Sequence, residues 1–285
     1  MPPLTTDGLL LVDKPAGMTS HDVVAIVRRE RGRVRTGHTG TLDPFATGLL
    51  VVTCGRATRL ARFIPSEPKV YRATITFGVA TDTDDVTGVV VGSAFLPDEP
   101  AVRSAIEQLT GDLQQLPPAY SAKHKDGRRA YALARQGIDP ELPASPVRVH
   151  AWHVREWSPP DLTADITCGS GTYIRALARD VGRLCGSAAH LTALRRTRVG
   201  PFDIDRSCAP DEAGSAPLVT PADALVGLPR QAVTTGEATR VRHGRAVAVR
   251  VEGAVAALVD RHGDLLAVAE READWWQPRV VLDAV

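Results

Sequence analysis

The apolar residues of this 285-residue chain fall into short runs, and that grouping limits what the chain can build. Two of the longest cover residues 9–12 and 254–259, whereas a membrane-spanning helix needs about 20 consecutive apolar residues. The amino terminus has no basic stretch followed by an apolar one, so no secretory signal is predicted. We therefore expect a cytoplasmic protein with no membrane partner, folded from many small elements.

The spacing of apolar residues within the runs predicts an α+β fold. Strand-like runs occupy residues 8–13, 49–53, 70–77, 88–92, 147–157, 162–167 and 191–200. Helical spacing occupies residues 20–31, 57–64, 98–110, 128–136 and 172–184, the first preceded by a Thr19-Ser20 cap. We expect residues 88–92 to pair with residues 70–77 as an antiparallel strand, and residues 33–44 to form a loop.

Two unequal domains are predicted from the change in pattern near residue 220. Residues 209–230 are rich in Ala, Pro, Asp and Gly, with a short helix expected at 221–225. Beyond them, short strands are expected around residue 241 and at 246–251, 254–259, 265–269 and 280–282. We place the boundary so that residues 1–227 form one domain and residues 228–285 a small β-rich domain.

Charge is unevenly distributed along the chain although the total is only +1. Residues 21–72, 119–136 and 175–198 carry net charges of +6, +4 and +5, which leaves −14 for the remainder. A chain divided in this way can present a basic face to a polyanion. RNA or DNA is the favoured partner, and a phosphorylated metabolite is the second choice.

No metal site or disulfide framework is predicted. The four cysteines are far apart with no C-x-x-C pair. Asp82, Asp84 and Asp85 fail the calcium-loop pattern, because Val86 and Thr87 follow where an acid and a glycine are required. We expect these aspartates in a solvated turn between strands. His150 and His153 have no third ligand nearby in the sequence.

The densest group of special residues is GHTGTLDP at 37–44. Residues 32–39 nearly match a phosphate-binding P-loop, but His38 replaces the lysine and no buried strand precedes the segment. Asp43 stands before Pro44, where it is either a turn former or a nucleophile held ionised by a cation. Arg175, at the predicted start of a helix, is one candidate for that cation.

Six motifs together resemble the TruB-type tRNA pseudouridine synthases. In order they are GLLLVDKPAGMTSHDVV, GHTGTLDPFATGLLVV, KVYRATITFGVATDTDD, PPAYSAKHKDGRRAYALARQG, CGSGTYIRALARDVG and AHLTALRRTRVGPF. They cover most of residues 8–202 in the order of that family. The resemblance implies the pseudouridine-synthase fold, a mixed and largely antiparallel central sheet flanked by helices. It also implies a C-terminal PUA-like RNA-binding domain, and conversion of the uridine at position 55, in the T loop of tRNA, to pseudouridine.

The resemblance also assigns roles to residues. Asp43 matches the catalytic aspartate, and Arg175 matches the arginine paired with it. Tyr71 matches the tyrosine that stacks on the flipped base and helps to remove the C5 proton.

Further residues match groups around the bound RNA. Tyr173 and Leu194 resemble residues of the uracil pocket, and His38 resembles the histidine that fills the T loop when the base leaves. His124 stands where the family often has lysine, so that contact is left out of the expected site.

The implied reaction needs no cofactor, because it breaks an N–C bond and forms a C–C bond at the same ribose carbon without net redox change. Extrusion of the base costs a few kcal/mol, which stacking partly offsets. We expect the T-stem loop of tRNA as the partner, no obligate protein partner, and a monomer. The alternative is a non-catalytic tRNA-binding or RNA-folding protein.

Overall fold

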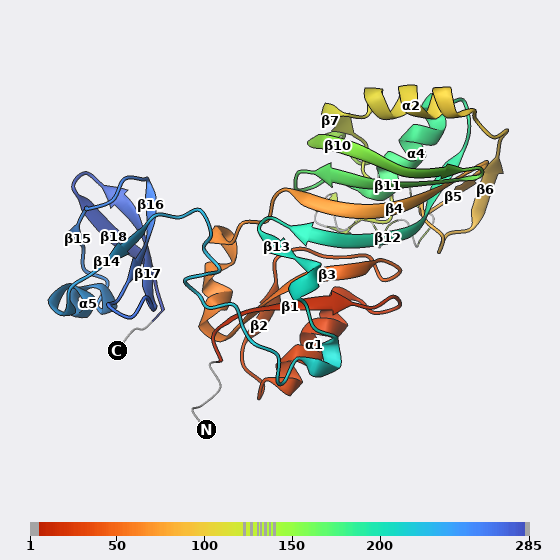
Figure 1. Cartoon of the computed structure of the whole chain (residues 1–285). Coiled ribbons are helices and arrows are strands. Elements are labelled where there is room, and N and C mark those ends of the chain that lie inside the picture. The colour runs from red at the N-terminus through yellow and green to blue at the C-terminus, as the bar shows by residue number, and fades with distance from the viewer. Residues whose placement is uncertain are drawn as a thin grey trace.

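A computed structural model of the chain describes residues 6–282, apart from 122–123, 126–127, 130, 132, 134–135, 137 and 139–140. Its larger sheet has the strand order β1-β3-β12-β4-β11-β10-β7, with β2 added to β3 and β13 to β12 (Figure 1). The bounds are β1 Gly8–Lys14, β2 Thr36–His38, β3 Thr47–Cys54, β4 Lys69–Phe77, β7 Gly111–Gln115, β10 Ser145–Ser158, β11 Asp161–Cys168, β12 Ala189–Val199 and β13 Phe202–Asp203. The expected α+β class is confirmed.

Strand β12 joins two parts of this sheet that are otherwise separate. It pairs with β4 in antiparallel fashion over most of its length, and with β3 in parallel at Arg195 and Arg196. The register sets Tyr71 of β4 opposite Arg196 on one side and Ile166 of β11 on the other. Directly paired residues share a sheet face, so the side chains of Tyr71 and Arg196 lie on the same face.

Both faces of β1 and β3 are covered, which explains why these strands are continuous apolar runs rather than alternating ones. Leu10 and Val12 of β1 pack with Val23 and Val27 of helix α1 (Ser20–Glu30). The intervening apolar residues face the 3₁₀ helix η1 (Gly55–Phe63). The predicted cap of α1 is confirmed, because Thr19 accepts from the Asp22 amide.

Helices α2 (Glu99–Gln108) and α4 (Ile174–Leu184) cover one face of the other half of the sheet (Figure 1). Ile174, Leu177 and Val181 of α4 are buried in the same cluster as Ile75 and Leu191 of the strands. The amino-terminal end of α4 is thereby fixed beside β4 and β12.

The pairing expected for residues 88–92 is wrong. Strand β6 (Val90–Ser93) pairs with β5 (Val79–Thr81) in a separate two-stranded ribbon. Strand β4 has no free edge for it, because β11 and β12 occupy both sides. Of the helix expected over 128–136, Arg128–Arg129 form strand β9 instead, paired with β8 (His124–Lys125). Tyr131 and Leu133 are helical as expected, and residues 130, 132 and 134–135 lie outside the described residues.

The expected loop over 33–44 contains a short strand, β2, which adds to β3 as an edge. Residues 221–225, expected as a short helix, form turns only. The 3₁₀ turns η2 (Ile204–Arg206) and η3 (Pro210–Glu212) follow the main sheet in the sequence and contact β1. None of the helices in the described ranges is long and apolar enough to span a bilayer.

The C-terminal part is a smaller sheet of order β14-β16-β17-β18-β15. Its bounds are β14 Arg230–Ala232, β15 Val247–Ala248, β16 Val255–Val259, β17 Leu265–Glu272 and β18 Trp275–Val281. Val241, expected in a strand, lies in helix α5 (Thr235–Arg242), which begins at a capping box of Thr234 and Glu237. Its side chain is buried beside Trp276.

A continuous apolar cluster joins this smaller sheet to the main one, in the region of η1 that Figure 1 shows beside the blue strands. Leu60 of η1 belongs to the same cluster as Leu265 and Val280. Arg56 and Arg59 of η1 donate to the carbonyls of Leu282 and Val281, at 2.9 and 2.6 Å. The boundary between residues 227 and 228 stays a prediction.

Candidate active site

A cavity of about 770 Å³ opens where the loop before β3 meets β4, β12 and the start of α4. Five of the predicted site residues line it, namely Asp43, Tyr71, Tyr173, Arg175 and Leu194. They come from segments that are far apart in the sequence, and the sheet order brings them together. Other lining residues include Lys69, Thr83, Asp85, Thr87, Tyr120, Ser121 and Arg196.

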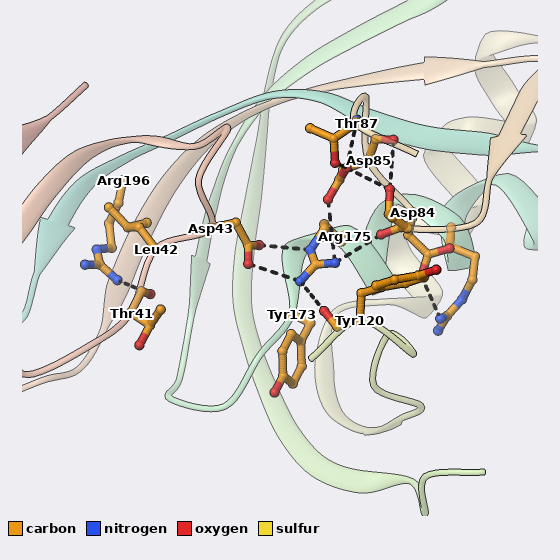
Figure 2. A network of polar contacts seen from close by, with 12 residues as sticks. Thr41, Leu42, Asp43, Asp84, Asp85, Thr87, Tyr120, Tyr173, Arg175 and Arg196 are labelled. Atoms are coloured by element: carbon orange, nitrogen blue, oxygen red, sulfur yellow. Dashed lines mark hydrogen bonds and ion pairs between the residues drawn. The ribbon is translucent and has the colours of Figure 1, made fainter. Parts of the chain in front are cut away.

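Asp43 and Arg175 form a two-point ion pair at the wall of this cavity (Figure 2). Arg175 Nε and Nη2 donate to the two carboxylate oxygens of Asp43 at 2.9 and 3.1 Å. The arginine side chain is 5% exposed and that of the aspartate 35%, so one partner is buried while the other faces the opening. The pair thus fixes the direction of the carboxylate and leaves it accessible.

The remaining donors of Arg175 are also used. They bind the carbonyls of Thr83 and Tyr120, at 3.1 and 3.0 Å, and Nη1 lies 3.6 Å from Asp85 Oδ2. All of these partners are acceptors, and together they hold the guanidinium against Asp43.

Asp85 is a part of the site that the sequence analysis missed. We expected a solvated turn, but Asp85 is 4% exposed and accepts from the Thr83 hydroxyl at 2.8 Å and from the Thr87 amide at 2.9 Å. Asp84 is also turned inward, where it pairs with Arg179 at 3.0 Å, and burial raises the pKa of its carboxyl. The expected turn between strands is confirmed and Asp82 is exposed in it, but the expectation is wrong for Asp84 and Asp85. Their carboxylates face two arginines of α4, which no local pattern reveals.

Arg196 holds the loop that carries Asp43. It is 1% exposed and donates to the carbonyls of Leu49, Gly40 and Thr41 at 2.8, 3.0 and 3.3 Å. Figure 2 shows it reaching the loop from β12, on the opposite side of Asp43 from Arg175. The loop is therefore tied to strand β12.

Lys14 holds the other end of the same loop. Its ammonium is bonded to the carbonyls of Pro15, Met18 and Pro44, at 2.9, 2.7 and 3.2 Å. The residue is fully buried, and burial lowers the pKa of Lys14 to about 8 against the opposing influence of Asp43. Sequence reasoning missed this residue, although its place before Pro15 within the first motif was a possible signal.

The two tyrosines and Leu194 give the cavity an apolar side suited to a planar ring. Tyr71 is 7% exposed, and burial raises the pKa of its hydroxyl while Arg196 opposes the rise. Burial also raises the pKa of Tyr173. The backbone of Tyr173 is held by the side chain of Gln115, because the Tyr173 amide donates to Gln115 Oε1 at 2.8 Å and Gln115 Nε2 donates to the Tyr173 carbonyl at 3.1 Å. Leu194 is 8% exposed.

His38 is the predicted residue that the structure does not bring to the cavity wall. It lies on β2, with its ring 5.7 Å from that of His21 in an edge-to-face arrangement. Burial lowers the pKa of His38, and both His21 and Arg196 act in the same direction. The ring is therefore held neutral beside the loop rather than inside the cavity.

Within the described ranges, no three His, Cys, Asp or Glu side chains lie together as metal ligands. The four cysteines are free, and burial raises the pKa of Cys54 and Cys168 to about 11. The role of His124, and of the lysines beside it, concerns side chains outside the described residues.

The cavity therefore combines an accessible carboxylate, fixed by a buried arginine, with an apolar side. Residues 28–174 match the TruB family pseudouridylate synthase (N terminal domain). Residues 175–212 match the tRNA pseudouridylate synthase B C-terminal domain. The chain belongs to the TruB family of pseudouridylate synthases.

Similar curated proteins span nearly the whole chain. The tRNA pseudouridine synthase B of Thermobifida fusca is 46% identical and aligns over 96% of this chain and 98% of its own length. The tRNA pseudouridine synthase B of Mycobacterium bovis BCG is 42% identical and aligns over 94% of this chain and 93% of its own length.

Solved structures agree on the fold. A structure of an H/ACA RNP bound to a substrate RNA containing 2'-deoxyuridine aligns with a TM-score of 0.73 at 21% identity, over 97% of this chain and 85% of the other. A Cbf5-Nop10-Gar1 complex gives 0.73 at 23% identity, over 98% and 86%. These similarities support the predicted pseudouridine-synthase fold.

Proposed function

We propose that this pseudouridine synthase acts on tRNA, and that it converts the uridine at position 55 in the T loop with Asp43 as the nucleophile. The curated relatives at 40–47% identity are named for tRNA. The observation that carries the role of Asp43 is its two-point bond to Arg175 at the wall of the cavity. No cofactor is included in the proposal.

Each step asks something specific of these side chains. The carboxylate of Asp43 attacks C6 of the uracil or C1′ of the ribose, or first removes a ribose proton, and in each case it must be ionised and oriented. Arg175 orients the carboxylate through its two bonds and places a positive charge beside it. Tyr71 stacks on the extruded ring and helps to take the proton from C5, and its burial keeps the detached uracil away from water.

Binding is assigned to groups around this centre. Tyr173 and Leu194 would enclose the uracil, and His38 would enter the T loop as the base leaves it. The three basic segments would contact phosphates, with an affinity that falls as salt rises. Residues 1–227 form the catalytic domain in this proposal, and residues 228–285 a PUA-like RNA-binding domain.

The proposal also includes the setting in which the enzyme works. We expect a monomer to be active. Its compartment is the cytoplasm, where the proposed tRNA substrate is found.

The test is release of tritium from tRNA transcript labelled at C5 of uridine. Asp43→Asn should abolish release while the affinity for tRNA changes little. Asp203→Asn is a matched control, because that side chain is 36% exposed and is also paired with an arginine, Arg198. Equal release by the Asp43→Asn variant and the wild type would refute the assignment.

The alternative of a non-catalytic tRNA-binding protein predicts no release by the wild type at any enzyme concentration. Mapping of the modified uridines in total RNA then tests the position. Modification elsewhere than position 55 would overturn the T-loop specificity but not the chemistry.

A further inference from the structure

Lys69 lies at the boundary between the active-site cavity and a second hollow. It is the first residue of β4, two residues before Tyr71, so both side chains point to the same face of the sheet. Its Nζ donates to the Ser170 hydroxyl at 3.0 Å. Lys69 lines the cavity, whereas Ser170 lines a neighbouring hollow of about 380 Å³ with Glu67, Arg148 and other residues.

The chain around Ser170 shows the same division. Gly169 and Ser170 line the second hollow, while Gly171 and Thr172, the next two residues, line the active-site cavity. The Lys69–Ser170 bond therefore closes a ridge between two adjacent spaces. A polynucleotide strand with one nucleotide in each space must cross that ridge with its backbone.

The ridge carries positive charge that is not balanced by direct ion pairs. Among the described residues, neither Lys69 nor the adjacent Arg196 has a carboxylate within 4.0 Å, and Arg196 donates to three carbonyl oxygens. Burial lowers the pKa of Lys69, and Arg196 lowers it further. Cys168 and Glu67 oppose this fall in pKa without cancelling it, so an incoming anion would stabilise the charged ammonium further.

Glu67 is a carboxylate whose charge raises the pKa of Lys69, and it also binds Ser170. Its carboxylate accepts from the Ser170 backbone amide at 2.8 Å. It thereby helps to hold the ridge in place, yet its charge opposes an anion there. Lys69 uses one of its three donors on Ser170, so two remain for a ligand. Arg196 is 1% exposed, so it acts through its charge rather than by contact.

We propose that Lys69, positioned by Ser170, binds the phosphodiester that joins the target uridine to its neighbouring nucleotide. The target base then occupies the active-site cavity, and the neighbouring nucleotide lies over the second hollow. The inference rests on the proposed function, because it assumes that a uridine within an RNA strand enters the cavity. It adds a phosphate-binding subsite to that function.

The experiment pairs a protein variant with a chemical change in the RNA. T-arm stem-loops carry a single uncharged methylphosphonate on the 5′ or the 3′ side of the target uridine, and dissociation constants are measured for wild type and Lys69→Met. At one of the two positions, wild type should lose about tenfold in affinity, the size expected for one charge-assisted hydrogen bond. Lys69→Met should bind unmodified RNA with about the same tenfold loss of affinity relative to wild type. The methylphosphonate should weaken binding to this variant by less than about a further twofold.

Three controls separate contact from a structural effect. Lys69→Arg should retain most of the affinity and most of the sensitivity to the methylphosphonate. Arg103→Met removes an exposed charge on α2 and should keep the wild-type sensitivity in full. Glu67→Gln removes the opposing charge and should tighten binding of the unmodified RNA, but not of the methylphosphonate.

The proposal would be overturned if the methylphosphonate weakened binding to Lys69→Met by the same factor as binding to wild type, because the two losses of affinity would then be independent. It would also be overturned if wild type bound both methylphosphonate RNAs as tightly as the unmodified RNA. Failure of the proposed function is a separate result, since it shows as absence of tritium release by the wild type from unmodified RNA. If wild type releases tritium but the effects of Lys69→Met and of each methylphosphonate on affinity are independent, the isomerase activity is supported and the phosphate-binding subsite is refuted.

Discussion

Replacement of Arg175 with methionine removes the guanidinium while it keeps a side chain of similar length in α4. Two hydrogen bonds to Asp43 are lost, at 2.9 and 3.1 Å. Hydrogen bonds to charged groups contribute about 1.5–3 kcal/mol each. The side chain of Asp43 is 35% exposed, so we take the lower end and expect a loss of about 3 kcal/mol in carboxylate positioning. This corresponds to about a 100-fold fall in turnover.

Stability should fall as well, because Asp85 loses the only cation that the described residues place within 4.0 Å of it. Breaking a buried ion pair on one side costs about 3–5 kcal/mol. The double variant Arg175→Met/Asp85→Asn removes the stranded charge. It should recover most of the melting temperature and none of the turnover.

The assay is single-turnover tritium release at saturating RNA, beside thermal unfolding of the same samples. Arg179→Met is the matched control, since Arg179 lies one turn further along α4, is 13% exposed and pairs with Asp84 instead. It should lose stability while turnover stays within about threefold of wild type, a margin of roughly half a tenfold step in rate. Equal loss of turnover in the two variants would refute the reasoning, because damage to α4 would then account for both.

Two further predictions concern buried titratable groups. The pKa of Lys14 is about 8 in the folded chain against 10.5 in its ordinary state, so between these pH values the unfolded chain holds a proton that the folded one has released. The unfolding free energy of wild type minus that of Lys14→Met, both measured by urea titration, should therefore rise between pH 8 and 10.5, by about 3 kcal/mol at most. A difference that does not change with pH would contradict this. Because the pKa of Cys54 and Cys168 is about 11, their alkylation by iodoacetamide at pH 8 should be roughly 100-fold slower than that of an ordinary thiol, as followed by mass spectrometry. Equal rates in native and urea-unfolded protein would show that the thiols are exposed.

The strands and the Asp43–Arg175 pair could be predicted because their signals are local or carried by motifs. The run at residues 9–12 is apolar throughout, and the structure shows the reason, since Leu10 and Leu11 face different cores. Asp43 before a proline in a glycine-rich segment suggested either a turn or a nucleophile. Its two hydrogen bonds to Arg175 show how a role as nucleophile would be supported.

The errors lie where a partner distant in sequence decides the outcome. Asp85 follows a turn pattern, but its environment is set by Arg175, ninety residues later. Val241 looked like one of several isolated apolar residues between glycines. A capping box at Thr234 starts a helix there, and the smaller sheet supplies the surface that buries it. Neither outcome can be read from a window of neighbouring residues.

The position of β12 has a consequence for how the chain is made. Strands β3 and β4 are synthesised early, yet each borders β12, which ends at Val199. Until β12 leaves the ribosome, no strand links β1 and β3 to the part of the sheet that contains β4. Asp43 and Arg175 are 132 residues apart and meet only when the two halves join. We therefore expect a nascent chain to hold its early strands unpaired at these edges, and to gain its reactive carboxylate late, in one cooperative step.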